Sequence, residues 1–387
     1  RNISLCFFAF YLIVIYMNDY LTSQIVTYMG NKRKLLPNIQ NIIETICEKE
    51  GKTKLKIGDG FSGTGIVSRL FKSYASVLYT NDIADYSFSL NQCFLSNISS
   101  ITEKKLKQYI ERANEYANNQ TVFMEPFISG KWAPLGKNIQ SDERAYFTYE
   151  NGKRIDIYRN YIETIPEPYK SFLLGVLLVE ISIHNNTNGQ FSAFYKDGAN
   201  LGKYGGKHEI DLHRIEAPIR LYMPVFTNTS TKIHIDKKDT NKWVQDIPEL
   251  DLVYYDPPYN KHPYSIYYFL LNIVARWDTS IDVPHTNRGQ PSGWHRSAYN
   301  SYKHAEKEFD NLIENTKSKY ILISYNNGGI IPLAKIDAIL EKYGTVEKIP
   351  VEHKTYNRLK GISNYKRKKE DSEIKEFFWL LEKTSRK

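Results

Sequence analysis

The stretch that decides the fold is Lys52–Tyr74, KTKLKIGDGFSGTGIVSRLFKSY. Its apolar residues from Leu55 to Ile57 predict a short strand, and the segment after Gly65 predicts a helix. A second apolar run, Ser76–Thr80, predicts another strand, which ends in Asn81-Asp82. The order strand, helix, strand implies parallel strands, so we expect an α/β protein with a doubly wound sheet.

Short apolar runs of the same kind return in the second half of the chain. They predict strands at 232–235, 252–255, 320–324, 346–354 and 377–382, the last two forming a hairpin around a basic loop. Together with the first two strands they predict a Rossmann-like seven-stranded sheet, mostly parallel with one antiparallel edge. Apolar residues at helical spacing also predict an amphipathic helix at Leu35–Glu48.

The middle of the chain has a different pattern. Polar helical stretches alternate there with loops rich in Asn, Gly and aromatic residues, apart from one strongly apolar helix expected at Tyr169–Ile183. We therefore predict an inserted, mainly helical lobe, residues 91–229. It would separate the two parts of the sheet domain, residues 21–90 and 230–387.

The charge balance suits a polyanionic partner without requiring one. The 387 residues include 52 Lys and Arg against 43 Asp and Glu, a net charge of +9. Neutralised phosphates release condensed counterions, which favours binding by a basic protein, although a basic protein with no such partner fits equally well. Cys6, Cys47 and Cys93 are too few and too scattered for a disulfide framework or a zinc site. The scarcity of cysteine makes a reducing, cytoplasmic setting the default expectation. The histidines lack metal-ligand spacing, so we expect no metal.

The N-terminal run Leu5–Tyr16, LCFFAFYLIVIY, resembles the core of a signal peptide. It is shorter than the roughly 20 residues that span a bilayer, and no small-residue cleavage pattern follows it. Met17 precedes an ordinary polar start, MNDYLTSQ. We interpret residues 1–16 as translated upstream sequence within a separate N-terminal segment, 1–20. A membrane anchor is the alternative.

The glycine-rich turn Asp59–Gly65, DGFSGTG, is a candidate cofactor site. Glycines at the end of a first strand let the backbone approach a ligand that faces the helix N-terminus. The spacing is neither GxGxxG nor a P-loop, which favours a cofactor with a zwitterionic amino-acid end over a pyrophosphate. A purely structural turn is the alternative. Asp82 follows about 20 residues later, where a carboxylate commonly binds a ribose diol, although it could also cap the next helix.

The sequence Asp256-Pro257-Pro258-Tyr259 directly follows the strand expected at 252–255. Two prolines cannot continue a central strand, so the chain must leave the sheet at its carboxyl edge, where α/β sheets hold ligands. Asp256 and the Pro257 carbonyl could accept both hydrogens of an amino group on a planar base, while Tyr259 stacks on the ring. A proline turn with a chance aspartate is the alternative.

These segments carry a family resemblance. DPPY resembles motif IV of the amino-methyltransferases, and DGFSGTG resembles their cofactor motif I. Tyr28–Lys34, YMGNKRK, is similar to motif X, which in that family precedes motif I and helps to bind S-adenosylmethionine. The order X, I, insertion, IV resembles the α-class, D12 or Dam-like, adenine-specific DNA methyltransferases. The resemblance extends from Tyr28 to Glu382, with the insertion matching only in position.

The resemblance implies an S-adenosylmethionine-dependent enzyme that methylates adenine N6 in DNA. The catalytic residues would be Asp256, Pro257, Pro258 and Tyr259. Asp239 resembles the acidic residue that contacts the cofactor adenine, although Thr240 stands where the family often has Phe. The expected cofactor contacts are Tyr28, Gly30, Asn31, Lys32, Asp59, Phe61, Ser62, Gly63, Gly65, Asp82, Asp239 and Asp256.

The same resemblance assigns parts of the chain to DNA. Ile321–Asn327 looks like a sheet motif that borders the catalytic pocket, and Glu352–Arg358 looks like a hairpin that faces DNA. The loop that follows is basic with interleaved tyrosines, a composition suited to phosphates and unpaired bases, or to a solvated loop. The inserted lobe would recognise the target through Gly189–Gly198 and Leu201–Ile215. The expected DNA contacts are Lys354, Tyr356, Arg358, Lys360, Lys366, Arg367 and Lys196.

The expected partners are double-stranded DNA and, in a restriction-modification system, a cognate restriction endonuclease. We expect a monomer or weak dimer in the cytoplasm, associated with the nucleoid through DNA. The alternatives are an N4-cytosine DNA methyltransferase, a methyltransferase of RNA or of a protein glutamine amide, and a non-enzymatic DNA-binding protein on a degenerate scaffold.

Overall fold

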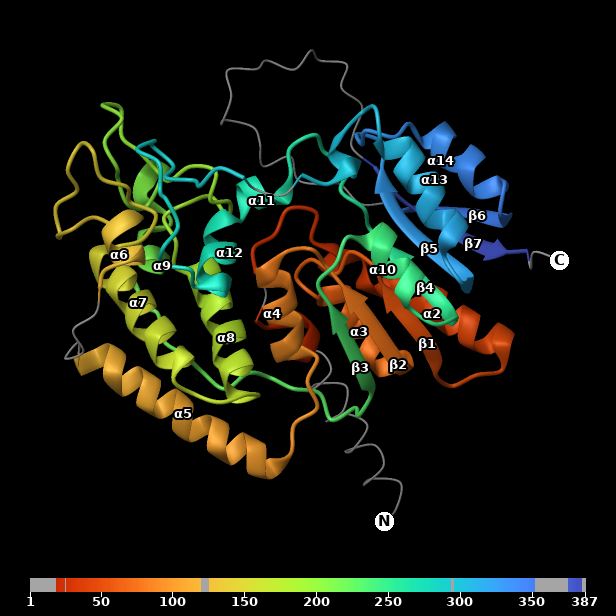
Figure 1. Cartoon of the computed structure of the whole chain (residues 1–387), viewed down its shortest axis with the longest axis horizontal. Coiled ribbons are helices and arrows are strands. Elements are labelled where there is room, and N and C mark those ends of the chain that lie inside the picture. The colour runs from red at the N-terminus through yellow and green to blue at the C-terminus, as the bar shows by residue number, and fades with distance from the viewer. Residues whose placement is uncertain (1–18, 25, 120–124, 294–295, 352–374, 385–387) are drawn as a thin grey trace.

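A seven-stranded sheet with its covering helices forms one half of the molecule, and a mainly helical lobe forms the other (Figure 1). The structure, a computed structural model, describes residues 19–24, 26–119, 125–293, 296–351 and 375–384. The apolar run Leu5–Tyr16 therefore lies outside the described residues. Among those that are described, no helix combines the length and the apolar character needed to cross a membrane.

The sheet confirms the seven predicted strands and shows their order. That order is β3 (Lys232–Asp236), β2 (Ala75–Asn81), β1 (Leu55–Asp59), β4 (Leu250–Tyr255), β5 (Ser318–Asn326), β7 (Glu376–Lys383) and β6 (Gly344–Val351). Neighbouring strands are parallel from β3 to β5, whereas β7 is antiparallel to both β5 and β6. The antiparallel pairs β5–β7 and β7–β6 thus lie at one edge of the sheet, as expected. The strand β7 is inserted between β5 and the edge strand β6.

Both faces of the sheet are buried at its central strands β1, β4 and β5, which explains why these strands read as largely apolar runs, whereas the edge strands β3 and β6 are mostly half-buried or exposed. In β4, Leu252 and Tyr254 face one hydrophobic cluster, while Val253 and Tyr255 face the other, as the alternation of side chains along a strand requires. The first cluster packs against α2 (Leu36–Glu50) and α3 (Ile66–Tyr74). The second packs against α10 (Thr240–Asp246), α13 (Ala305–Asn315) and α14 (Leu333–Glu341).

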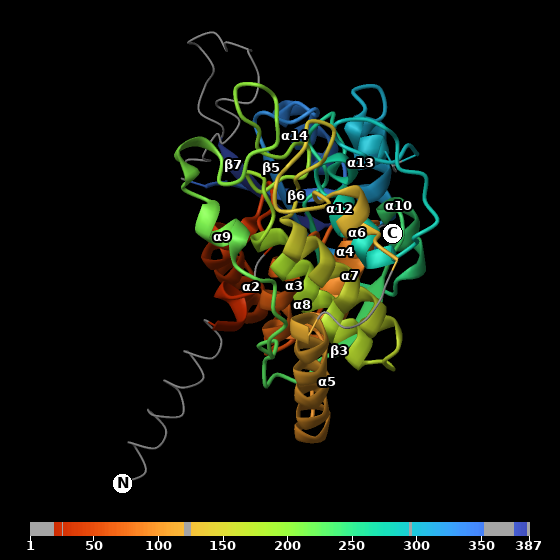
Figure 2. The ribbon, with the colours of Figure 1, turned by 90° about the vertical axis from the view of Figure 1, so that its left-hand side faces the viewer.

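The lobe is built around α8, Tyr169–Ile183, which has the bounds predicted from its apolar sequence. Buried residues surround this helix, and α5 (Ser100–Asn119) lies on the outer side of the lobe against α7 (Tyr149–Glu163) and α8 (Figure 2). The same core takes in α4 (Asp85–Phe94) and α12 (Phe269–Arg276). The packed lobe therefore includes helices on both sides of the predicted insertion, residues 91–229. The lobe's shorter helices are α6 (Ile128–Lys131), η2 (Lys207–Glu209) and α9 (Leu212–Glu216).

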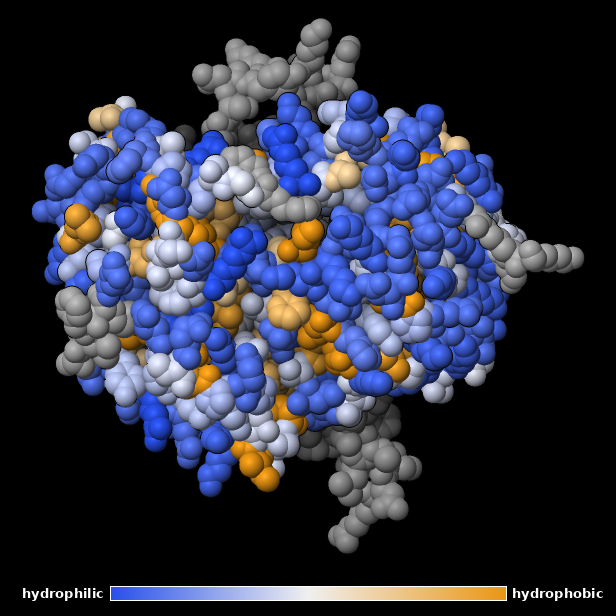
Figure 3. All heavy atoms as spheres, viewed as in Figure 1, coloured by the Kyte–Doolittle hydropathy of each residue, from blue (hydrophilic) through white to orange (hydrophobic). Residues whose placement is uncertain are grey.

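The two halves meet along the carboxyl ends of the strands. The face seen in Figure 3 is largely hydrophilic, and apolar side chains are exposed on it mainly near the seam between the lobe and the sheet domain. Three short helices carry residues of the cavity described below. They are η1 (Lys32–Leu35), α11 (Tyr264–Tyr267) and η3 (Ala298–Asn300).

Candidate active site

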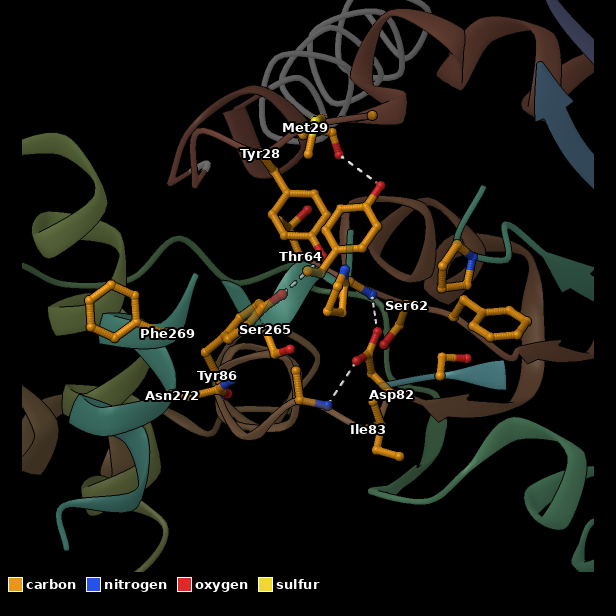
Figure 4. A pocket seen from close by; sticks show the side chains of 18 of the residues that line it. Tyr28, Met29, Ser62, Thr64, Asp82, Ile83, Tyr86, Ser265, Phe269 and Asn272 are labelled. Atoms are coloured by element: carbon orange, nitrogen blue, oxygen red, sulfur yellow. Dashed lines mark hydrogen bonds between the residues drawn. The ribbon is translucent and has the colours of Figure 1, made fainter. Parts of the chain in front are cut away.

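A cavity of about 390 Å³ lies at the carboxyl ends of β1, β2 and β4. The glycine-rich turn, Asp82 and Asp256 line it from the sheet, and Tyr28–Lys32 lines it from the segment before α2. Figure 4 shows the Asp82 carboxylate facing the turn that carries Ser62, with Tyr28 and Met29 closing the upper side in this view. Three motifs that are far apart in the sequence thus border one cavity.

Almost all of the predicted cofactor residues line this cavity. They are Tyr28, Gly30, Asn31, Lys32, Asp59, Phe61, Ser62, Gly63, Asp82, Asp239 and Asp256. Gly65 is not among the lining residues. Its φ of +77°, and a Cβ that would stand 2.3 Å from Asn91 Oδ1, give it another role, which is to let α3 begin close against α4.

Asp82 was interpreted from the sequence either as a ribose-binding residue or as a helix cap, and the structure shows features of both. Its carboxylate accepts hydrogen bonds from the amides of Gly63 (2.8 Å) and Ala84 (2.9 Å), and Ala84 is the N-cap of α4. It also lines the cavity, so a contact with a ribose remains a prediction. Burial raises the pKa of Asp82, and the backbone amides oppose that shift.

The floor of the cavity contains two further buried carboxyl groups. Asp59 accepts a hydrogen bond of 2.6 Å from Ser68 Oγ, and burial, with the charges of Asp256 and Asp82, raises its pKa to about 7. Burial likewise raises the pKa of Asp256 to about 6, where the Lys32 ammonium lowers it and the Glu376 carboxylate raises it further. Both groups therefore titrate close to neutral pH.

Lys32 contacts the predicted catalytic carboxylate. Its Nζ lies 3.1 Å from Asp256 Oδ1 and 3.8 Å from Glu376 Oε2. The side chains of Lys32 and Glu376 are each 4% exposed, and that of Asp256 is 18% exposed. Glu376 was not predicted from the sequence, because nothing in its neighbourhood indicated that β7 would lie beside β5 and bring its first residue to this site.

Tyr259 sits in an aromatic environment that was only partly foreseen. Its ring packs edge-on against Tyr325, with centroids 5.8 Å apart. Tyr28 stacks on Tyr264 at 5.2 Å and on Tyr268 at 4.6 Å. Tyr264 and Tyr268 were not predicted, although their sequence positions shortly after DPPY were a signal that could have suggested them. Of the two prolines, Pro258 lines the cavity and Pro257 does not.

A second hollow, of about 240 Å³, adjoins the site. Tyr259 lines it and Met29 lines both hollows, so the DPPY corner lies between them. The remaining lining residues are mostly polar or aromatic: Asn260, Lys261, His262, Tyr267, Tyr302, Gly328 and Ile330.

Thr240 fills the place where the family often has Phe. Its hydroxyl donates to the Gly60 carbonyl at 2.9 Å, which ties α10 to the glycine turn. Asp239 caps α10 by accepting from the Asn241 amide at 3.1 Å, and it also lines the cavity. Aromatic surface is supplied instead by Phe61 and Tyr299, which pack edge-to-face at 5.4 Å.

The predicted DNA contacts are described only in part. Lys196 lies in the lobe, where its Nζ donates to Asn200 Oδ1 at 3.1 Å and sits 5.1 Å from the Phe194 ring centroid. The other six predicted DNA contacts, Lys354, Tyr356, Arg358, Lys360, Lys366 and Arg367, lie outside the described residues. Within the part of the chain that the structure describes, no group of three or more His, Cys, Asp or Glu could hold a metal ion.

Comparison with known proteins agrees with this geometry. Residues 28–327 match the family described as D12 class N6 adenine-specific DNA methyltransferase. The type II methyltransferase M.NlaIII of Neisseria lactamica is 30% identical over 365 residues, which cover 93% of this chain and 100% of the relative. M.FokI of Planomicrobium okeanokoites is 29% identical over 92% of this chain, and M.CviAII of Paramecium bursaria Chlorella virus 1 is 26% identical over 88%. The alignments cover 52% of M.FokI and 95% of M.CviAII, so this chain spans about half the length of M.FokI.

A solved structure, of a Thermoplasma acidophilum protein, aligns over 92% of this chain and all of its own length with 10% identity and a TM-score of 0.29. That likeness is too low to add to the strand order and the site. The match to the family covers most of the chain and includes the glycine turn and the DPPY corner. The chain therefore belongs to the D12 class of N6 adenine-specific DNA methyltransferases.

Proposed function

We propose that this adenine DNA methyltransferase uses Asp256 and the main-chain carbonyl of Pro257 to hold the amino group of an adenine flipped out of duplex DNA. The observation that supports the proposal is the position of Asp256. Its carboxylate borders the same cavity as the glycine turn and Tyr28–Lys32, so an amino group bound at Asp256 would stand beside a cofactor bound in the cavity.

The cavity has the charge and size expected for S-adenosylmethionine. Carboxylates dominate its lining, with Asp59, Asp82, Asp239, Asp256 and Asp278 against the cations Lys32 and Arg276. Asp59 and Asp82 are ionisable, buried groups that a cation would stabilise in their charged form. A volume of about 390 Å³ is also within the usual range for such ligands. When bound, S-adenosylmethionine supplies a methyl group on a positively charged sulfur.

The DPPY corner then has three tasks. Asp256 and the Pro257 carbonyl accept the two amino hydrogens, which directs the nitrogen lone pair away from them and into the cavity. Tyr259 stacks on the extruded base and offsets part of the few kcal/mol that extrusion costs. Because its pKa is about 6, Asp256 is largely ionised at neutral pH and accepts hydrogen bonds.

We further propose that the lobe and the basic loop select the DNA site, and that the enzyme modifies DNA for restriction-modification. The relatives M.NlaIII, M.FokI and M.CviAII are named as type II methyltransferases. A cognate endonuclease that cuts the same site when it is unmethylated would then be the partner.

The test is methylation of duplex DNA by the purified chain with labelled S-adenosylmethionine, followed by nucleoside mass analysis. We expect N6-methyladenine, and we expect Asp256→Ala to abolish it while DNA binding persists. The control is Asp246→Ala, because Asp246 is an exposed aspartate that pairs with Lys238 outside the cavity. Product at N4 of cytosine, or activity retained by Asp256→Ala, would overturn the proposal. Single-molecule sequencing of DNA from an expressing host would identify the recognition site.

A further inference from the structure

Three ionisable side chains from separate parts of the chain meet at the DPPY corner. Lys32 comes from η1, Asp256 follows β4, and Glu376 is the first residue of β7. The Lys32 ammonium lies between the two carboxylates, 3.1 Å from one and 3.8 Å from the other. It also lies 5.5 Å from the centroid of the Tyr259 ring.

A lysine in this position must remain charged. Burial opposes the charged form, but Asp256 and Glu376 outweigh that effect and hold the pKa of Lys32 above its usual value. A buried ammonium without such partners would be costly. Asp256 and Glu376 therefore fix a permanent positive charge next to the group that is to hold the substrate amine.

The two carboxylate oxygens of Asp256 have different partners. Oδ1 faces Lys32 at 3.1 Å, which leaves Oδ2 to accept from an amino group, since a carboxylate has two acceptor oxygens. Without Lys32, Asp256 would face the Glu376 carboxylate with no cation between them. Two carboxylates in one buried place favour protonation of one of them.

We infer that Lys32 is a positioning residue that holds Asp256 ionised and correctly turned, and that Glu376 holds Lys32 in place. The inference rests on the proposed role of Asp256. It differs from the expectation that Lys32 serves as a cofactor contact, because the cation acts on the catalytic carboxylate. Through Glu376, its first residue, β7 becomes part of the active site.

Other ionisable groups also face Asp256 and must be considered in any test that uses pH. They are Tyr254 on β4, Asp59 on β1, Tyr259 within the DPPY turn and Tyr264 after it. The pKa values of the three tyrosines are raised well above their usual range by burial, so they stay neutral between pH 5 and 8. Asp59 titrates in that range but is present in every variant below.

The test compares Lys32→Met and Glu376→Gln by single-turnover methylation rates between pH 5 and 8. Removing Lys32 should raise the pKa that limits the rate on the acid side, and removing the Glu376 charge should lower it. A shift of about one pH unit from a pKa of about 6 changes the rate at pH 6 about fivefold for Lys32→Met. Opposite shifts from two members of one cluster are not expected from a general loss of packing.

Two further measurements distinguish a change in the ionisation of Asp256 from weaker cofactor binding and from loss of folding as the cause of a lower rate. Calorimetry of S-adenosylmethionine binding at pH 8, where Asp256 is largely ionised in every variant, should give a dissociation constant within about threefold of the unmodified protein for both variants, whereas a cofactor contact at Lys32 would weaken binding more. Thermal unfolding reports folding directly, and Glu376→Gln keeps the shape of the side chain if Lys32→Met is unstable. The matched controls are Lys49→Met and Glu382→Gln, a lysine–glutamate pair between α2 and β7 at 2.6 Å whose side chains are 55% and 35% exposed.

The outcomes distinguish this inference from the proposed function. An inactive Asp256→Ala together with unchanged pH profiles in both cluster variants would overturn the positioning role alone. A loss in Lys32→Met that is accounted for by weaker cofactor binding would also overturn it. An active Asp256→Ala would overturn the proposed function itself.

Discussion

Gly30 stands so close to Tyr259 that a Cβ on Gly30 would lie 2.5 Å from the tyrosine hydroxyl oxygen. The φ of Gly30 is +75°, in the region that other residues rarely adopt. The segment before α2 therefore reaches the DPPY corner only because a glycine is present. This contact is the structural link between motif X and motif IV.

Gly30→Ala should reduce methylation more than it reduces stability. The positive φ costs about 1–2 kcal/mol, and the new methyl group must push Tyr259 out of place. We expect the rate to fall at least about tenfold, with only this modest loss in the free energy of unfolding. The control is Gly51→Ala, since Gly51 has a φ of +63° and no atom within 4 Å of an added Cβ. Equal activity in the two variants would contradict the assigned contact.

Tyr259→Ala should weaken capture of the base, while Tyr259→Phe should largely retain it. Stacking of a base on an aromatic ring is worth about 1–3 kcal/mol, and phenylalanine keeps the ring. The measurement is the fluorescence of 2-aminopurine placed at the target position, together with the affinity for S-adenosylmethionine, which should change in neither variant. Similar losses in both variants would show that the hydroxyl, and not the ring, matters.

Cofactor binding should strengthen as the pH rises from 5.5 to 7.5. The pKa is about 7 for Asp59 and about 6 for Asp256 in the free protein. A cationic ligand favours ionised carboxylates, so these pKa values should fall on binding. The ligand then binds best above the free-state values and loses affinity as the carboxyls become protonated below them.

Calorimetry in two buffers of different ionisation enthalpy should detect the protons released on binding. S-adenosylhomocysteine, which has no charge on sulfur, should show a smaller pH dependence and provides the control. An S-adenosylmethionine affinity that is constant over this range would mean that the cofactor's positive charge does not sit near these carboxylates.

Arg69→Met should destabilise the fold without altering the site. The Arg69 side chain is 2% exposed, and its guanidinium donates to the carbonyls of Ser23 (3.2 Å) and Gln24 (3.1 Å) while it packs on Phe94. Loss of these charged hydrogen bonds should cost about 2–4 kcal/mol, measured by chemical denaturation. Lys104→Met, at an exposed position of α5, is the control and should change little. A normal free energy of unfolding for Arg69→Met would mean that the 19–24 segment contributes little to stability.

The strands and motifs could be predicted because their signals are local. Buried parallel strands such as β4 read as apolar runs, and a glycine turn or a Pro-Pro corner constrains its own backbone. The DPPY corner and the glycine turn were accordingly placed at one sheet edge, and they border one cavity with Tyr28–Lys32, which had been assigned from its resemblance to motif X. The bounds of α8 also followed from its sequence, because a helix that is apolar on all sides is a core helix.

Other features depend on how distant segments come together. The position of β7 between β5 and β6, and hence Glu376 beside Lys32, follows from the strand order. The participation of α12 in the lobe core likewise needs its packing partners. Lys32 was assigned to the cofactor from its motif, whereas in the folded chain its ammonium contacts Asp256. Local patterns contain none of this information.

The position of β7 in the sheet has a consequence for folding during synthesis. Among the described strands, β6 pairs with β7 alone, and β7 is synthesised after it. All of the residues that line the main cavity precede Ser301. A nascent chain on the ribosome would thus contain all of the residues that line this cavity before β6 had a strand to pair with, and an unpaired strand is prone to aggregate. Variants that slow the emergence or insertion of β7 should therefore reduce the yield of folded enzyme before they change its chemistry.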